Sequence, residues 1–303
     1  MTTGNPIHVL QFGEEGQLGR ELTRIADADR AFHHTVLSFT QADFTRPEQI
    51  AAAVLAAPQL DVVVNAAAYT AVDRAESEPA LAQAINGDAV GRLAQACKDR
   101  GVPLIHVSTD YVYDGAKSGP YVESDRPNPL NVYGRTKLSG EDKIRVCLDA
   151  HVILRTSWVY SAHGANFVKT MLRLGAERDE LRIVDDQKGA PTSAADLAQA
   201  IMTIARALPV SEDARRFGTF HFANGGETSW RQFAEEIFAQ ARWAQIRARV
   251  VPIAAADYPT PARRPTNSRL DTNKIKNVFG IVPPAWQTSL TPVLAELQQG
   301  HAA

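Results

Sequence analysis

Cysteine is scarce in this chain of 303 residues, and long uninterrupted apolar runs are absent. Cys97 and Cys147 both fall in stretches with helical patterning, where a small buried thiol is more typical than a disulfide and suits a reducing cytoplasm. No run approaches the roughly 18 apolar residues of a membrane span. Met1–Pro6 lacks the basic and then apolar order of a signal peptide. We therefore expect a cytoplasmic protein with no membrane partner.

Charge of one sign is also missing, because the formal net charge is only −2. No global basic field favours nucleic acid or an anionic membrane as a partner. The eight histidines show no paired ligand spacing, so the sequence predicts no metal site. Hydrophobic content of 45% and charged content of 22% are ordinary for a globular protein large enough for one big domain or two moderate ones.

The first two-thirds of the chain alternate short apolar runs with longer helical patterns. The predicted strands are residues 7–12, 35–39, 61–64, 104–107 and 151–154, and the predicted helices are 17–28, 48–57, one that begins near 77–79, and 132–147. Short, almost wholly apolar strands between helices are typical of a doubly wound parallel sheet that is covered on both faces. We predict an α/β fold with a Rossmann-like domain over residues 1–158.

Prolines and glycines become denser after Trp158. We predict a helix over 192–208 and a strand over 219–222. Ser229 and Gln232 have the spacing of a capping box at the start of a helix that ends near Ala241. Residues 251–270 are predicted to form a long proline-rich loop. Residues 159–303 are therefore expected to form mainly a smaller substrate-binding lobe, interleaved with the first domain.

A glycine-rich turn follows the first strand, with Gly13, Gly16 and Gly19 at relative positions one, four and seven. Glycine permits positive φ and close approach of a ligand to the backbone, and the following helix N-terminus favours a pyrophosphate. This placement predicts dinucleotide binding; the alternative is a plain strand-to-helix turn. Glu14 and Glu15 would repel a pyrophosphate, so we expect at least one of them to point into solvent.

The second predicted strand ends without the acidic residue that would hold an adenosine ribose, and without an arginine for a 2′-phosphate. The sequence therefore accepts NADPH or NADH. Asp43 and Phe44 could flank the adenine; the alternative is a helix cap before Pro47. Small residues at 65–70 would let a cofactor lie against the backbone, although tight packing of the next helix explains them equally well.

Tyr133 and Lys137 are one turn apart on a predicted helix and project from the same face. A lysine ammonium near a phenol stabilises the phenolate, which is the equipment for reducing a carbonyl or oxidising an alcohol. Ser108, Thr109 and Asp110 end the fourth predicted strand, at the edge where open α/β sheets bind ligands. The glycine turn, the Ser108-Thr109 hydroxyl pair and the Tyr-x-x-x-Lys motif thus follow one another on successive elements of one predicted sheet.

These motifs resemble the extended short-chain dehydrogenase/reductases and, within them, the dTDP-4-dehydrorhamnose reductase family. The resembling stretches, which run through almost the whole chain, are 13–19, 64–76, 108–113, 131–137, 155–160, 186–192, 258–262 and 264–270. The first and fourth stretches are typical of the superfamily, and the others are particular to the sugar-nucleotide reductases. The resemblance implies NAD(P)H-dependent reduction of the C4 ketone of dTDP-4-dehydro-L-rhamnose, for cell-surface polysaccharide.

The resemblance also implies residue roles. Tyr133 would donate the proton, Lys137 would bind the nicotinamide ribose and lower the tyrosine pKa, and Thr109 would support the tyrosine. The residues that would line the cofactor are Gly13, Gly16, Gln17, Leu18, Asp43, Phe44, Ala68, Tyr69, Thr70, Tyr133 and Lys137. Thr109, Asp110 and Trp158 would contact the sugar nucleotide, although Trp158 can equally be an ordinary half-buried tryptophan.

Two arginines of the proline-rich loop, Arg264 and Arg269, could grip the substrate diphosphate bidentately; the alternative is a solvated surface position. Some relatives place magnesium at a dimer interface with helix carboxylates. Glu21 matches one such position, but Ala195 stands where another carboxylate is expected. Magnesium is therefore kept as an alternative and not predicted as a cofactor, and a homodimer is likewise an alternative.

Two other functions fit the same fold. An epimerase or dehydratase of the superfamily would need an acid/base pair such as Asp-Glu where this chain has Asp110-Tyr111. A non-catalytic regulatory subunit, such as the β-subunit of methionine adenosyltransferase, would keep the fold without the chemistry. Intact Tyr133 and Lys137 favour the reductase, and the two glutamates of the glycine turn are the feature that favours the regulatory subunit.

Overall fold

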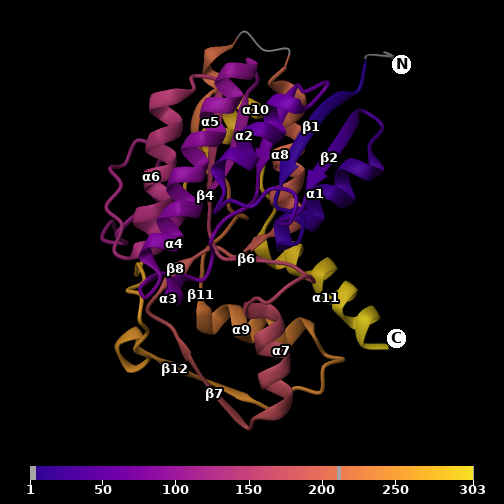
Figure 1. The fold of residues 1–303 in the computed structure, drawn as a ribbon. Helices are drawn as coiled ribbons and strands as arrows, with labels where there is room; N and C mark the ends of the chain where they lie inside the picture. Colours follow the sequence, from indigo (N-terminus) through magenta and orange to yellow (C-terminus); the bar gives the residue numbers. More distant parts are fainter. Residues whose placement is uncertain (1–4, 210–212, 303) are drawn as a thin grey trace.

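The computed structural model describes residues 5–209 and 213–302. Its upper part, as drawn in Figure 1, is a parallel sheet wrapped by helices. All six strands of the sheet pair in parallel. Their order across the sheet is β2 (Phe32–Leu37), β1 (Ile7–Phe12), β3 (Val62–Asn65), β4 (Leu104–Thr109), β5 (His151–Thr156) and β10 (Gly218–His221). The strand order reverses at β1, the point where open sheets of this kind bind ligands.

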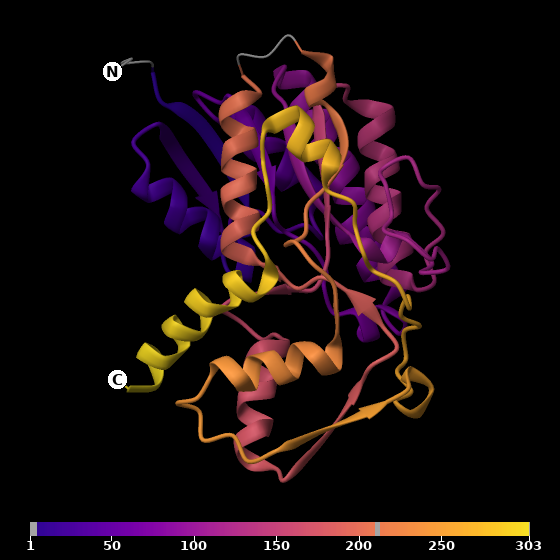
Figure 2. The same cartoon turned by 180° about the vertical axis from the view of Figure 1, so that it is seen from behind.

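Helices cover both faces of the sheet, and each face has its own apolar core. One face carries α1 (Gln17–Ala28), α8 (Ala194–Ala207) and α10 (Asn273–Phe279), and Figure 2 shows the last two side by side across it. The other face carries α2 (Pro47–Ala56), α5 (Ala89–Arg100) and α6 (Val132–Cys147). Because helices bury the strands on both faces, the strand sequences are nearly continuous apolar runs.

A second, smaller lobe lies below the sheet in Figure 1. Its core joins α7 (Phe167–Glu177), α9 (Trp230–Gln240) and α11 (Trp286–Ala302), beside the parallel pair β7 (Glu180–Val184) and β12 (Arg249–Ile253). Two short pairs complete it, β6 (Val159–Tyr160) with β9 (Thr192–Ser193), and β8 (Lys188–Gly189) with β11 (Thr228–Ser229). Because β10, α8 and α10 return to the large sheet, the chain passes repeatedly between the two parts.

Short helical pieces connect the main elements. After β3 come α3 (Val72–Ala75), α4 (Pro79–Gln83) and a π-helical segment, Ala84–Asp88, which continues directly into α5. The 3₁₀ turns are Asp110–Val112, Ala214–Arg216 and Ala255–Asp257. No helix in the described parts of the chain is both long and apolar enough to cross a membrane.

The predicted α/β fold with a doubly wound parallel sheet is confirmed. The helices at 17–28 and 132–147 and the capping box at Ser229 were predicted correctly. The second strand was predicted too late, because its pairing with β1 begins at Phe32. The proline-rich loop was predicted too long, because its start is strand β12. Sequence reasoning missed α7, β7, α10 and α11.

Candidate active site

The candidate site lies at the carboxyl edge of the large sheet, where β1, β3 and β4 end. Parallel strands bring their carboxyl ends to one edge, so the glycine turn, the 65–70 loop and the Ser108–Asp110 stretch meet there. Helix α6 then delivers Tyr133 and Lys137 from its first turns, capped by the Asn131 side chain, which accepts from the Gly134 N–H at 2.8 Å.

The glycine turn combines close backbone packing at two glycines with open space at the third. Gly13 has φ of +92°, and a Cβ there would stand 2.7 Å from the Ala67 backbone nitrogen. A Cβ on Gly19 would stand 1.9 Å from the Gly13 carbonyl oxygen. A Cβ on Gly16, in contrast, would meet no described atom within 4 Å, so the backbone at the start of α1 faces open space. Glu14 and Glu15 are both exposed, which agrees with the expectation that at least one of them points into solvent.

Gln17 and Leu18 turn away from this open space. Leu18 is buried in the apolar core, so only its backbone can face a cofactor. The Gln17 carboxamide oxygen accepts hydrogen bonds from Asn166 at 2.9 Å and Ser161 at 3.2 Å. Asn166 is the N-cap of α7, so the glycine turn and the start of α1 are tied to the smaller lobe.

Asp43 and Phe44 have local structural partners. The Asp43 carboxylate accepts from the backbone N–H and the hydroxyl of Thr45, both at 2.8 Å, which is the turn just before α2. Phe44 is buried edge-on against Phe12, with ring centroids 5.8 Å apart. These contacts match the alternative of a helix-preceding cap, and adenine contact by either residue stays a prediction.

The 68–70 loop is fixed by a residue that sequence reasoning missed. Asn86 accepts from the Tyr69 N–H at 2.9 Å and donates to the Tyr69 carbonyl at 3.0 Å. It lies on the π-helical segment, and such bulges often occur at functional sites. The Tyr69 hydroxyl donates to Glu78 at 2.6 Å. Ala68 and Tyr69 remain half-buried and Thr70 exposed, beside the glycine turn. An asparagine inside an apolar helical pattern was the available signal.

Tyr133 is held next to Thr109 and Asp110. Burial raises the pKa of the Tyr133 phenol to about 12; a hydrogen bond with the Thr109 side chain lowers it, and the charge of Asp110 raises it. The phenol therefore keeps its proton at neutral pH and can donate it. The Thr109 hydroxyl oxygen also lies 3.0 Å from Asp110 and accepts from the Tyr111 N–H at 3.1 Å, which holds it beside Tyr133.

Asp110 is almost fully buried, and burial raises the pKa of its carboxyl to about 6. One of its oxygens, Oδ2, has no hydrogen-bond partner in the described part of the chain. The Ser268 side chain interacts with the same carboxyl and lowers its pKa, so contact of Asp110 with the sugar nucleotide stays a prediction.

Lys137 is 2% exposed, and its amine donates to the Val107 carbonyl at 2.7 Å. Burial lowers the pKa of this amine to about 8, and the charge of Glu141 partly opposes that effect. Within the described residues, no direct hydrogen bond joins the amine to the Tyr133 hydroxyl. Binding of the nicotinamide ribose by this amine stays a prediction.

Trp158 lies at the entry to the smaller lobe with a left-handed backbone, φ of +48°. Such strain in a residue other than glycine often accompanies functional sites. Its ring is half-buried and stacked on Trp230, with centroids 3.7 Å apart, and Gly189 leaves room for it. These contacts match the alternative of a packed tryptophan; contact with the sugar nucleotide stays a prediction.

The two late arginines are engaged by carboxylates. Arg264 donates twice to Asp73, at 2.7 and 3.1 Å, and Arg269 pairs with Glu227 at 2.8 Å. Both are largely shielded from solvent and not free surface side chains. A role in gripping the diphosphate would require exchange of these partners and stays a prediction.

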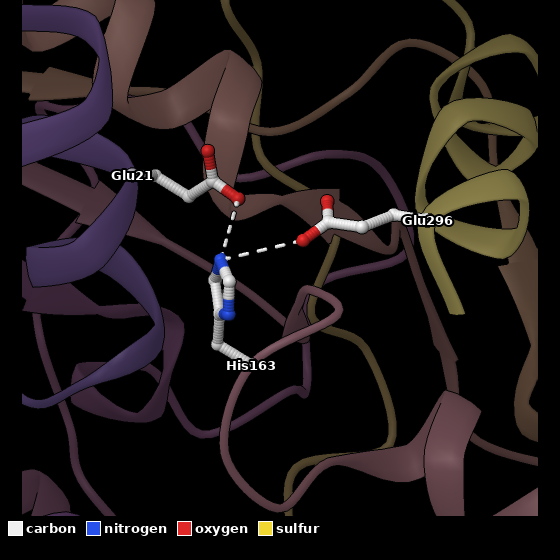
Figure 3. A group of neighbouring side chains, drawn as sticks. All are labelled: Glu21, His163 and Glu296. Atoms are coloured by element: carbon white, nitrogen blue, oxygen red, sulfur yellow. Dashed lines mark ion pairs between the residues drawn. The ribbon is translucent and has the colours of Figure 1, made fainter. Parts of the chain in front are cut away.

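A cluster away from the strand edge bears on magnesium. His163 lies between Glu21 of α1 and Glu296 of α11, with Nε2 3.7 and 3.6 Å from their carboxylate oxygens (Figure 3). Ala195, at the start of α8, supplies no ligand. Mg²⁺ prefers oxygen ligands in octahedral geometry, whereas an imidazole suits transition metals. This donor set does not fit magnesium, and we derive no step of the reaction through a metal.

The chain matches a known protein family and curated sequences over most of its length. The sequence model of the RmlD substrate binding domain family matches residues 7–299. A dTDP-4-dehydrorhamnose reductase of Sinorhizobium fredii is 53% identical over 232 residues, which cover 76% of this chain and 78% of that protein. The enzyme of the same name from Escherichia coli K12 is 44% identical over 298 residues, 96% of this chain and 98% of that protein.

Solved structures give the same result. A Clostridium acetobutylicum dTDP-4-dehydrorhamnose reductase superposes with a TM-score of 0.89 at 35% identity, covering 96% of this chain and 100% of that chain. The Bacillus anthracis enzyme, solved in complex with NADP, has a TM-score of 0.87 at 33% identity, with coverage of 96% and 99%. A Streptomyces venezuelae dTDP-glucose 4,6-dehydratase, at 18% identity and a TM-score of 0.76, shares the fold.

Proposed function

The chain belongs to the dTDP-4-dehydrorhamnose reductase family, and from that premise we propose that Tyr133, Lys137 and Thr109 carry its NAD(P)H-dependent reduction of a sugar ketone. The observation that carries this assignment is the half-buried, protonated Tyr133 phenol beside Thr109 at the carboxyl edge of the sheet. The reaction of the family is reduction of the C4 ketone of dTDP-4-dehydro-L-rhamnose to dTDP-L-rhamnose, in deoxysugar supply for polysaccharide.

The turn from Gly13 to Gly19 fits the pyrophosphate of a dinucleotide. Gly16 leaves the helix N-terminus open, and α1 has no acidic residue in its first turn to oppose an anion. When bound, the reduced nicotinamide supplies the hydride. Ala68, Tyr69 and Thr70 would lie along it, held by Asn86. Both NADPH and NADH are candidates.

Tyr133 supplies the proton in this proposal. As negative charge develops on the ketone oxygen, the phenol donates its proton to it, and the alcohol forms. Thr109 keeps the phenol oriented, and Asp110 offers its unpartnered oxygen to a hydroxyl of the sugar. The phenolate that remains is stabilised by the Lys137 ammonium, which is favoured below a pH of about 8. Trp158, Arg264 and Arg269 are proposed contacts of the nucleotide.

Turnover with the natural substrate class tests the proposal. Purified protein should oxidise NADPH or NADH only when a dTDP-4-keto-6-deoxyhexose is present. Tyr133→Phe should abolish this turnover and leave cofactor affinity within about threefold, because only the proton-donating hydroxyl is removed. Lack of turnover with both cofactors would refute the reductase assignment. Unchanged activity in Tyr133→Phe would remove the tyrosine from the mechanism.

The two alternatives make different predictions in the same assay. An epimerase or dehydratase would convert a dTDP-hexose without net oxidation of added cofactor. The chain has Asp110-Tyr111 where such an enzyme needs a second acid or base, and Tyr111 is packed edge-on against Tyr133. A regulatory subunit would bind nucleotide without turnover. A cytoplasmic location and a homodimer are expectations that fractionation and light scattering can check.

A further inference from the structure

A buried chain of polar side chains runs behind Lys137, from the end of β3 to α6. Asn65 and His106 are register partners on the neighbouring strands β3 and β4, and both are 0% exposed. Asn65 Nδ2 is 3.0 Å from His106 Nδ1, and His106 Nε2 is 3.4 Å from Lys137 Nζ. The mechanism above uses only the lysine, so the other two groups have no role yet.

The network fixes the tautomer of His106. The Ala67 backbone N–H can only donate, so the Asn65 atom 3.0 Å from it is the carboxamide oxygen. The Asn65 NH₂ group therefore faces His106, and because it can only donate, Nδ1 must carry the lone pair. Burial and the nearby Lys137 lower the pKa of His106 well below its usual 6.5, so the ring is neutral. The neutral ring thus has its single proton on Nε2, pointed at Lys137.

This arrangement discriminates between the two forms of the lysine. An ammonium at Lys137 would set N–H against N–H across 3.4 Å, whereas a neutral amine offers a lone pair that the Nε2–H can reach. The other groups that face the amine are the Val107 carbonyl and Glu141, one turn further along α6. Glu141 favours the ammonium, but Arg155 holds its carboxylate at 2.9 and 2.6 Å and offsets its charge.

We propose that His106, held as its Nε2–H tautomer by Asn65, is a positioning residue that disfavours the Lys137 ammonium and so sets the pH at which this lysine gives up its proton. In each turnover one proton passes from the ammonium towards the Tyr133 phenolate and restores the phenol. The neutral amine left behind accepts the His106 N–H until it is reprotonated from water. The inference rests on the proposed function, because it assumes that Lys137 serves Tyr133.

Two variants test this role: one reverses the tautomer of His106, and the other removes its N–H donor. In Asn65→Asp the carboxylate accepts from both the Ala67 N–H and His106, so the ring proton moves to Nδ1 and Nε2 becomes an acceptor. In His106→Gln the amide oxygen can accept from the ammonium without adding charge. His106→Gln exchanges the hydrogen-bond polarity alone, so the alkaline limb of kcat/KM should move upward by about one pH unit. Asn65→Asp adds a buried negative charge that itself favours the Lys137 ammonium, so its limb should move upward by at least as much. His34→Gln, on strand β2, is the matched control and should leave the limb in place.

The variant profiles decide the role of His106 in turnover. An upward shift in both variants and none in the control supports the proposal. Unshifted profiles in folded, active variants overturn it. A loss of rate with an unchanged limb also overturns it, because that pattern is what a purely structural role would produce.

A second measurement needs neither variant to be active. Long-range ¹H–¹⁵N spectra of histidine-labelled wild type should show the His106 proton on Nε2, with the signal assigned by its loss in His106→Gln. A proton on Nδ1 would overturn the proposal even in an active enzyme. If the tautomer is as proposed but the wild type shows no turnover, the reductase assignment fails and not the hydrogen-bond network.

Discussion

The Gly19 Cα lies so close to the Gly13 carbonyl that a Cβ would stand 1.9 Å from the oxygen. The first turn of α1 is therefore packed directly on the backbone of the strand-to-helix turn. Gln11, buried in β1, adds to this contact by donating to the Gly19 carbonyl at 3.1 Å. The glycine at the seventh position of the turn thus serves close packing, and the one at the fourth leaves the backbone open to a ligand.

This contrast predicts opposite outcomes for two glycine variants. Gly19→Ala should lower the free energy of unfolding by about 2–4 kcal/mol, because backbone atoms must shift to admit the methyl group. Gly16→Ala should leave unfolding within about 0.5 kcal/mol but raise the cofactor Kd, because the methyl group would enter the space proposed for the pyrophosphate. Thermal unfolding with and without NADPH separates the two effects. Equal stabilities would refute the packing role of Gly19.

Lys137→Met should abolish turnover while stabilising the fold at pH 7. Burial lowers the pKa of the lysine from its ordinary 10.5 to about 8, so the folded state disfavours the ammonium by about 3 kcal/mol. The lost hydrogen bond to Val107 destabilises the variant by about 1 kcal/mol. The net increase in the free energy of unfolding is therefore about 2 kcal/mol. Denaturant unfolding measures it.

The pH dependence of that gain has a defined sign. Between pH 8 and 10.5 the unfolded chain binds a proton that the folded chain does not, so wild-type stability rises with pH across this window. The advantage of Lys137→Met should therefore be full below pH 8 and shrink towards pH 10.5. Lys143→Met, a partly exposed lysine of the same helix, should show neither effect. A gain that is constant with pH would contradict the burial argument.

Thr109→Val should reduce kcat by about 10- to 100-fold. It should also lower the free energy of unfolding by about 1–3 kcal/mol, because the Asp110 carboxylate and the Tyr111 N–H lose their partner. The hydroxyl lowers the pKa of the Tyr133 phenol, which burial otherwise raises, so its loss makes the phenol a weaker acid. Thr109→Ser keeps the hydroxyl and should restore most of the rate. Steady-state kinetics of the pair provide the check. Equal rates in the valine and serine variants would show that the hydroxyl is not used.

Asn86→Ala should loosen the 68–70 loop. It removes two hydrogen bonds to the Tyr69 backbone and one to the Thr136 hydroxyl at 3.2 Å, and it leaves buried partners unsatisfied. We expect a loss of about 2–3 kcal/mol of stability and a higher KM for the cofactor. Asn86→Asp retains only the acceptor for the Tyr69 N–H. Its stability and its KM for the cofactor should lie between those of the wild type and the alanine variant. An unchanged cofactor KM in the alanine variant would place the loop outside the cofactor site.

The fold of the first half was predictable because its signals are local. Helix α6 begins at an asparagine cap and the strands of the large sheet are apolar runs, so sequence periodicity located them. The smaller lobe was harder. Strand β12 contains Pro252 and pairs with a strand about 70 residues earlier, and α11 contains Pro292 in its interior. Proline in both segments masked patterns that only tertiary contacts stabilise.

The site was predictable to the extent that it follows motifs. Tyr133, Lys137, Thr109 and the glycine turn are brought to one sheet edge, as the motif order indicated. The supporting residues Asn86, Asn65 and His106 were missed, because their contacts are set by distances in the fold, and single polar residues in apolar patterns were their only signal in the sequence. His106 carried a weak signal as a histidine between Ile105 and Val107 in a buried strand. Partners such as Asp73 for Arg264 lie about 190 residues away and require the fold.

The hydrogen bonds from Ser161 and Asn166 to Gln17 constrain how this enzyme can be recombined with its relatives. A chimera that joins the sheet of one reductase to the small lobe of another will cut between these positions in sequence. Position 17 and the 161–166 segment should then be inherited from the same parent. If they come from different parents, Gln17 loses its hydrogen-bond partners. Exchanging the small lobe to change the substrate preference would then also weaken cofactor binding.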